Sequence, residues 1–68
     1  MRYFSYEKPA AEAQIAPQKL ARLRSAVRRD FPKDDMMFEL HMLRLCTTIR
    51  AGHVTIDQAL ADESEAAA

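Results

Sequence analysis

The segment from Asp34 to Ala51 constrains the fold most, because its apolar side chains surround most of the circumference of a helix. At about 100° per residue, one packing face of this helix collects Phe38, Met42, Leu45, Cys46 and Ile49. A second apolar strip lies on another side and consists of Met36, Leu40 and Leu43. A helix with two apolar sides needs more than one neighbour to shield it from water.

Turn signals predict where this helix begins and ends. Pro32 precedes it, and the carboxylate of Asp34 or Asp35 can accept a first-turn N–H. Gly52 follows it and suits the left-handed turn that commonly closes a helix. We therefore expect one helix over residues 34–51.

Two further helices are predicted on either side. The first spans residues 17–30, because Pro17 fits a first helical position and a narrow apolar stripe follows it: Leu20, Leu23, Val27 and Phe31. The second spans residues 55–63, where Thr55 and Gln58 have the spacing of a capping box. We expect the 55–63 helix to cover one strip of the 34–51 helix.

The ends of the chain carry weaker signals. Tyr3, Phe4 and Tyr6 favour extended backbone, but the sequence offers no second strand to pair with them. We interpret residues 1–16 as an extended aromatic arm and linker that packs on its own helices or on another chain. Residues 64–68 have little to bury and are predicted to fray. The expected fold is therefore an all-α, three-helix domain over residues 17–63.

Composition indicates that this domain needs outside support. Of 68 residues, 49% are hydrophobic, and twelve of these are Ala, so few large side chains are available for a core. A single cysteine, Cys46, excludes a disulfide within the chain, and Cys and His lack the spacing of a zinc site. No cofactor or membrane span is expected, and we predict a cytoplasmic protein. Small domains without these supports commonly complete their core with another protein chain.

Charge is segregated although the formal net charge is zero. Residues 16–33 hold six basic residues against one acidic, whereas residues 51–68 hold four acidic and no basic residues. The simplest interpretation is that the acidic C-terminal helix lies near the basic one. The alternative is an anionic partner, such as a nucleic acid, for four arginines: Arg22, Arg24, Arg28 and Arg29.

Catalytic chemistry is not indicated. Cys46 and His41 point about 140° apart on a helix, so they do not form a nucleophile–base pair. His53 and Asp57 are expected to be an exposed loop histidine and a first-turn carboxylate. Glu39 is unusual, because it projects between the two apolar strips. It either curls out to solvent or forms a buried ion pair with Arg24, Arg28 or an arginine of a second chain.

Two functions follow as predictions. The first is a non-enzymatic helical interaction module that completes its core by homodimerisation or by docking on a larger protein. Its expected interface residues are Tyr3, Phe4, Tyr6, Met36, Met37, Leu40 and Leu43. The alternative is a small dimeric nucleic-acid-binding regulator that uses the basic helix. Its order of elements resembles that of ribbon-helix-helix repressors, with residues 2–6 pairing across the dimer, although residues 10–16 intervene.

Overall fold

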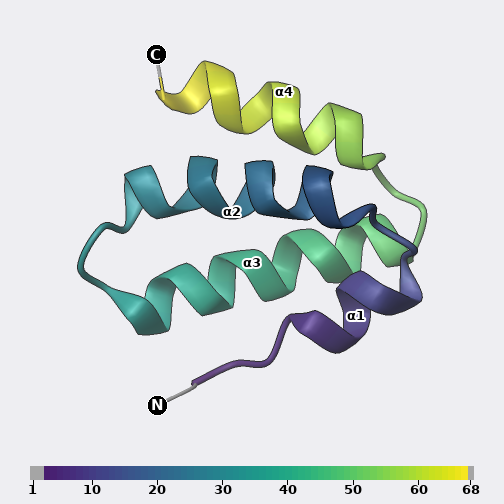
Figure 1. Ribbon diagram of the computed structural model, residues 1–68, viewed down its shortest axis with the longest axis horizontal. Coiled ribbons are helices and arrows are strands. Elements are labelled where there is room, and N and C mark those ends of the chain that lie inside the picture. The colour runs from purple at the N-terminus through teal and green to yellow at the C-terminus, as the bar shows by residue number, and fades with distance from the viewer. Residues whose placement is uncertain (1–2, 68) are drawn as a thin grey trace.

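The computed structural model describes residues 3–67, with side chains up to residue 63, and this part of the chain is helical without strands (Figure 1). The helices are α1 (Glu7–Glu12), α2 (Pro17–Asp30), α3 (Asp35–Arg50) and α4 (Ile56–Ala67). The all-α prediction is confirmed. The N-terminal arm, however, contains the short helix α1, where extended backbone was predicted.

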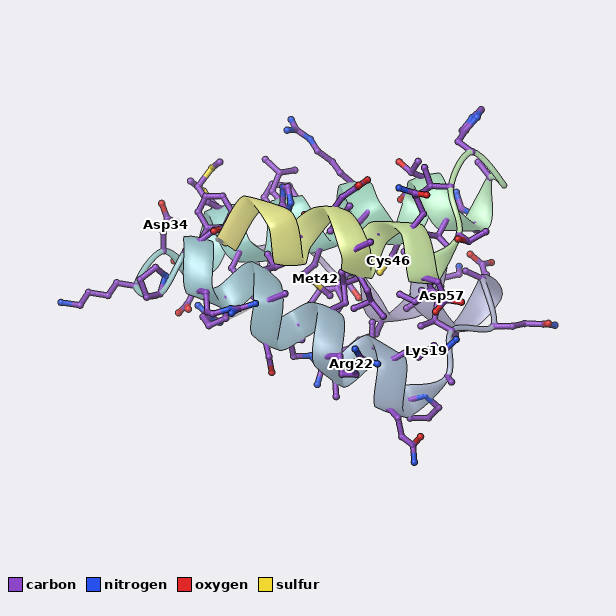
Figure 2. The ribbon with its side chains drawn as sticks, turned by 90° about the horizontal axis from the view of Figure 1, so that it is seen from above. Lys19, Arg22, Asp34, Met42, Cys46 and Asp57 are labelled. Carbon is purple, nitrogen blue, oxygen red and sulfur yellow. The ribbon has the colours of Figure 1, made fainter. Side chains whose placement is uncertain are left out.

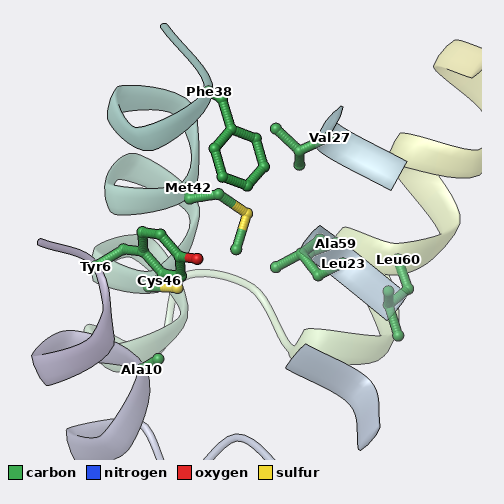
Figure 3. Packing of buried hydrophobic residues seen from close by; sticks show 9 residues of the cluster. All are labelled: Tyr6, Ala10, Leu23, Val27, Phe38, Met42, Cys46, Ala59 and Leu60. Atoms are coloured by element: carbon green, nitrogen blue, oxygen red, sulfur yellow. The ribbon is translucent and has the colours of Figure 1, made fainter. Parts of the chain in front are cut away.

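The helices lie side by side in the order α4, α2, α3, α1 (Figure 1). α2 packs on both α4 and α3, and α1 packs on the opposite side of α3. This order corrects one expectation, since α4 lies mainly on α2 rather than over an apolar strip of α3. The reason is that Ala59 and Leu60 of α4 enter the core beside Leu23 of α2 (Figure 3).

The predicted ends of α2 and α3 are confirmed to within one residue. Pro17 stands at the start of α2. The Asp34 side chain accepts the Met37 N–H at 3.0 Å and so caps α3. Gly52 has a φ of +84°, and the next N–H, of His53, bonds back to the Thr48 carbonyl at 3.2 Å. This left-handed turn closes α3 in the manner that favours glycine.

α4 is longer than predicted. Thr55 Oγ1 accepts the Gln58 N–H at 3.1 Å, as expected of an N-cap, but the Gln58 side chain donates forward to Asp62. The helix continues to Ala67, so the backbone of residues 64–67 is helical where fraying was predicted, and residue 68 lies outside the described part. His41 Nε2 and Glu63 Oε1, 2.8 Å apart, join α4 to α3.

The expectation of an extended arm is corrected by α1. Pro9 lies in the first turn of this helix, where its missing N–H breaks no helical bond. Gln14 takes a φ of +58° and ends the helix, with the Ile15 N–H bonded to the Ala10 carbonyl at 3.2 Å. Tyr6 and Ala10 are buried, so this part of the arm packs on its own chain.

The core collects side chains from all four helices between α2 and its neighbours α3 and α4 and between α3 and α1 (Figure 3). Leu23, Val27, Met42 and Cys46 are almost fully buried. The Tyr6 ring meets Phe38 edge to face, with ring centroids 6.1 Å apart. Aromatic packing of this kind holds α1 against α3.

Candidate functional site

One apolar side of α3 is only partly shielded from solvent. We call it the α3 strip and define it as Met36, Met37, Leu40 and Leu43. Met36 is 46% exposed, and the other three side chains are half-buried, with Leu43 also packing against the core. α1 has six residues and α4 lies mainly on α2, so neither helix shields the strip fully. As the sequence predicts, α3 therefore has more apolar surface than the neighbouring helices shield.

The segment before α1 crosses the edge of the α3 strip. The backbone N–H groups of Tyr3 and Phe4 both donate to Glu39 Oε1 at 3.1 Å. Tyr3 is 51% exposed and lines, with Met36, an open hollow of about 610 Å³. The exposed aromatic ring thus extends the apolar surface that the α3 strip begins.

Glu39 is buried, so the interpretation that it curls out to solvent is wrong. Its described partners are the two backbone N–H groups rather than Arg24 or Arg28. A carboxylate that accepts two N–H groups has part of its hydration replaced. Glu39 therefore fastens the N-terminal segment to α3.

Tyr6 is corrected from an interface residue to a core residue. It is 8% exposed, and its hydroxyl oxygen accepts the Nε–H of Arg24 at 3.0 Å. Phe4 is half-buried and Tyr3 is exposed. The structure therefore leaves Tyr3, and in part Phe4, as the aromatic side chains that a second chain could contact.

Two of the four basic side chains proposed for anion contact also make contacts within the chain. Arg24 lies against Tyr6, and the Arg28 guanidinium stands 3.8 Å from the centroid of the Phe38 ring. A terminal nitrogen of Arg28 also donates to Asp35 at 2.8 Å and to the Phe31 carbonyl at 3.3 Å. Aromatic rings and hydrogen bonds hold both guanidinium groups in place.

Arg24 and Arg28 line a hollow of about 700 Å³ between α1, the end of α2 and the start of α3. We call this hollow the arginine pocket. Its walls include Tyr6, Arg24, Ser25, Arg28, Arg29, Pro32 and Phe38, together with the carboxylates of Glu7 and Glu39. Arg22 is absent from this lining and instead borders a smaller hollow between α2 and α4. Three of the four predicted anion contacts thus line the arginine pocket, and Arg22 lies on the neighbouring hollow, whose walls also include Ser25 and Arg29.

Ser25, Pro32 and Phe38 also form walls of this pocket, which the sequence alone does not predict. The spacing of Arg24 and Arg28 places them on one helix face, which was a usable signal. The contact of this face of α2 with Tyr6 and Phe38 depends on how the helices pack, and no local sequence pattern predicts that contact.

Other charged residues form ion pairs between helices. Lys19 and Asp57 approach to 2.9 Å across α2 and α4 (Figure 2), and Arg50 pairs with Glu12 at 2.8 Å. The first pair and the packing of α4 on α2 agree with the simplest interpretation of the charge segregation. The nucleic-acid alternative has less structural support, because residues 3–6 form no strand and Arg28 pairs with Asp35.

Cys46 and His41 lie in different environments. Cys46 is fully buried, whereas His41 binds Glu63 and packs beside the Phe31 ring. Burial raises the pKa of the Cys46 thiol from its usual 9.0 to about 11, and the nearby Arg24 charge opposes this shift. A thiol with a raised pKa is a poor nucleophile at neutral pH.

The raised pKa of Cys46 predicts a loss of stability in alkali. The unfolded chain loses the thiol proton above pH 9.0, but the folded chain keeps it until about pH 11. The contribution of the protonated thiol to the free energy of unfolding is therefore complete below pH 9.0 and is lost by about pH 11, at a cost of about 2 kcal/mol. Denaturant unfolding from pH 8 to pH 11 should show a steeper decline for the natural chain than for Cys46→Ala. Parallel curves would contradict the assignment.

Within the described residues, no group of three or more His, Cys, Asp or Glu side chains is arranged to hold a metal ion. None of the helices in this part is both long and apolar enough to cross a lipid bilayer.

Comparison with known proteins identified no relative of this chain. No protein-family model matches this chain, and no curated protein or solved structure matches it significantly.

Proposed function

We propose that this protein is a non-enzymatic helical interaction module that pairs with a second copy of itself through the α3 strip. The observation that carries the proposal is the partly shielded apolar side of α3, with Met36 46% exposed beside the 51% exposed Tyr3. Large apolar side chains gathered on one surface mark interaction sites more often than scattered ones do.

The spacing within the strip favours a helix as the occupant. Met36, Leu40 and Leu43 follow one another at intervals of four and three residues, which is the spacing of a coiled-coil seam. A seam on one copy can receive the same seam of another across a two-fold axis, since such an interface uses one surface twice.

Charge favours a second copy as well. The chain has a formal net charge of zero, so long-range repulsion does not oppose self-association. The α3 strip contains no charged residue, and Arg44 lies at its border, where it can remain in water. Pairing of two strips would therefore bury apolar surface without burying an unpaired charge.

A non-enzymatic role is supported by the state of the candidate nucleophile, since Cys46 is buried and His41 is bonded to Glu63. A reducing, cytoplasmic setting suits a chain with a single cysteine in thiol form.

Leu40→Glu tests the proposal, because it places a charge at the centre of the seam without removing a core side chain. We expect the natural chain to sediment at twice the monomer mass of 7.8 kDa, and Leu40→Glu to weaken association by at least about tenfold. Gln18→Glu, which adds the same charge at an exposed position of α2, is the matched control and should leave association unchanged. Sedimentation equilibrium over a range of concentrations measures all three chains.

Two results would overturn self-association. One is a natural chain that remains monomeric at several hundred micromolar. The other is a Leu40→Glu variant that dimerises as tightly as the natural chain. A monomer whose amide signals for residues 36–43 shift on adding a purified protein partner would replace the second copy with docking on a larger protein.

A further inference from the structure

The arginine pocket is distinct from the α3 strip and has a different chemistry. Its volume of about 700 Å³ lies within the usual range of small-molecule sites, which is roughly 300 to 1,000 Å³. It combines apolar surface from Tyr6, Phe38 and Pro32 with the guanidinium groups of Arg24, Arg28 and Arg29. Such a lining suits a ligand that is apolar in one part and anionic in another.

Arg28 provides a flat surface for the apolar part of a ligand. One side of its guanidinium faces the buried Phe38 ring at 3.8 Å, while its side chain remains 40% exposed. Guanidinium planes stack on flat apolar groups, and the aromatic ring beneath limits the freedom that stacking would otherwise remove. Pro32, exposed at the same pocket, offers a second apolar contact.

Arg24 and Arg29 provide donors for the anionic part. Arg24 uses its Nε–H on the Tyr6 hydroxyl, so both terminal nitrogens remain for a ligand. Arg29 is exposed and has no hydrogen bond or ion pair with the described residues. Ser25, between these two positions on the same stretch of α2, adds a hydroxyl to the pocket wall.

The carboxylates of the pocket restrict how an anion can enter. Glu39 belongs to the wall formed by α3, and Asp35 at the start of α3 already pairs with Arg28. These negative charges disfavour an anion on that side of the pocket. The α2 side, with Arg24, Ser25 and Arg29, is therefore the place for an oxyanion.

We infer that the arginine pocket binds a small organic anion that carries a phosphate or carboxylate on a flat apolar body. The oxyanion binds Arg24, Ser25 and Arg29, and the flat body stacks on Arg28 beside Pro32. A ligand with only the oxyanion or only the flat body would contact only part of the pocket. This inference does not depend on the proposed self-association, because no residue of the α3 strip lines the pocket.

Phenyl phosphate and benzoate are suitable probes for the chain of 68 residues. Their binding can be measured by NMR from the amide signals of an isotopically labelled sample. We expect at least one of the two probes to give saturable shifts centred on residues 24–29 and 38–39. Inorganic phosphate, which lacks the flat body, should bind about tenfold more weakly. Benzyl alcohol, which lacks the charge, should give no saturable shift at these residues.

Arg29→Gln and Arg44→Gln form a matched pair, because both remove one charge from an exposed helical position and only Arg29 lines the pocket. Arg29→Gln should weaken probe binding by about tenfold, the usual effect of losing a charged hydrogen bond. Arg44→Gln should change it less than about twofold, since Arg44 lines neither the pocket nor the neighbouring hollow. Circular dichroism of both variants confirms that each is folded.

Several outcomes would overturn the inference. One is the absence of shifts at these residues from both aromatic anions at millimolar concentration, and another is a loss of binding in Arg44→Gln as large as that in Arg29→Gln. Equal affinity for inorganic phosphate would remove the apolar part of the proposal. Equal affinity for benzyl alcohol would remove the anionic part.

Discussion

Met42→Ala is expected to unfold most of the protein at room temperature. The Met42 side chain is 0% exposed and extends from α3 toward α2, between the Phe38 and Tyr6 rings (Figure 3). Replacing a buried methionine by alanine costs about 2 to 5 kcal/mol through lost burial and the cavity that remains. A core of this size rarely supplies more than about 3 to 5 kcal/mol of net stability. The substitution therefore removes most or all of the stability.

Met36→Ala is the matched control, because it deletes the same atoms from the same helix at an exposed position. At a concentration where the chain is monomeric, its cost should stay within about 0.5 kcal/mol. Urea unfolding followed by circular dichroism compares the two variants. Similar losses for Met42→Ala and Met36→Ala would show that Met42 is not the centre of the core.

Glu39→Ala is expected to cost about 1 to 3 kcal/mol, because it leaves the N–H groups of Tyr3 and Phe4 without their acceptor. The residues before α1 should detach first, since Glu39 fastens them to α3. Hydrogen exchange at the amides of residues 3–6 should accelerate, and urea unfolding should give the change in free energy.

Two controls separate this effect from a general loss of charge. Glu39→Gln keeps an oxygen acceptor and should retain part of the stability that Glu39→Ala loses. Glu12→Ala breaks the exposed pair with Arg50 and should cost less than about 1 kcal/mol. If Glu39→Ala is as mild as Glu12→Ala, the N-terminal segment is not held by this carboxylate.

Glu39 and Cys46 differ in how much of their environment the sequence predicts. The helical position of Cys46 on the packing face predicted its burial correctly. The position of Glu39 between two apolar strips indicated that it needed a partner, and arginines were the expected choice. The described partners are backbone N–H groups, whose proximity depends on the path of residues 3–6 and leaves no side-chain pattern in the sequence.

The helix α1 illustrates a different limit. Pro9 and the aromatic residues before it suggested an extended arm, yet Pro9 fits the first turn of a short helix. A helix of six residues is marginal by itself, so its local signal is weak. Burial of Tyr6 and Ala10 against α3 supplies the stability that the isolated segment lacks.

The sequence by itself determined the ends of α2 and α3, because proline, aspartate and glycine act on the backbone next to them. It also determined that α3 is apolar on more than one side, since helical periodicity follows from residue order alone. Only the tertiary structure decided that α4 lies mainly on α2, that the α3 strip is only partly shielded, and that Arg24, Arg28 and Arg29 share a pocket with Tyr6 and Phe38. These features arise from contacts between residues far apart in the chain, and many packings compete for the same apolar faces.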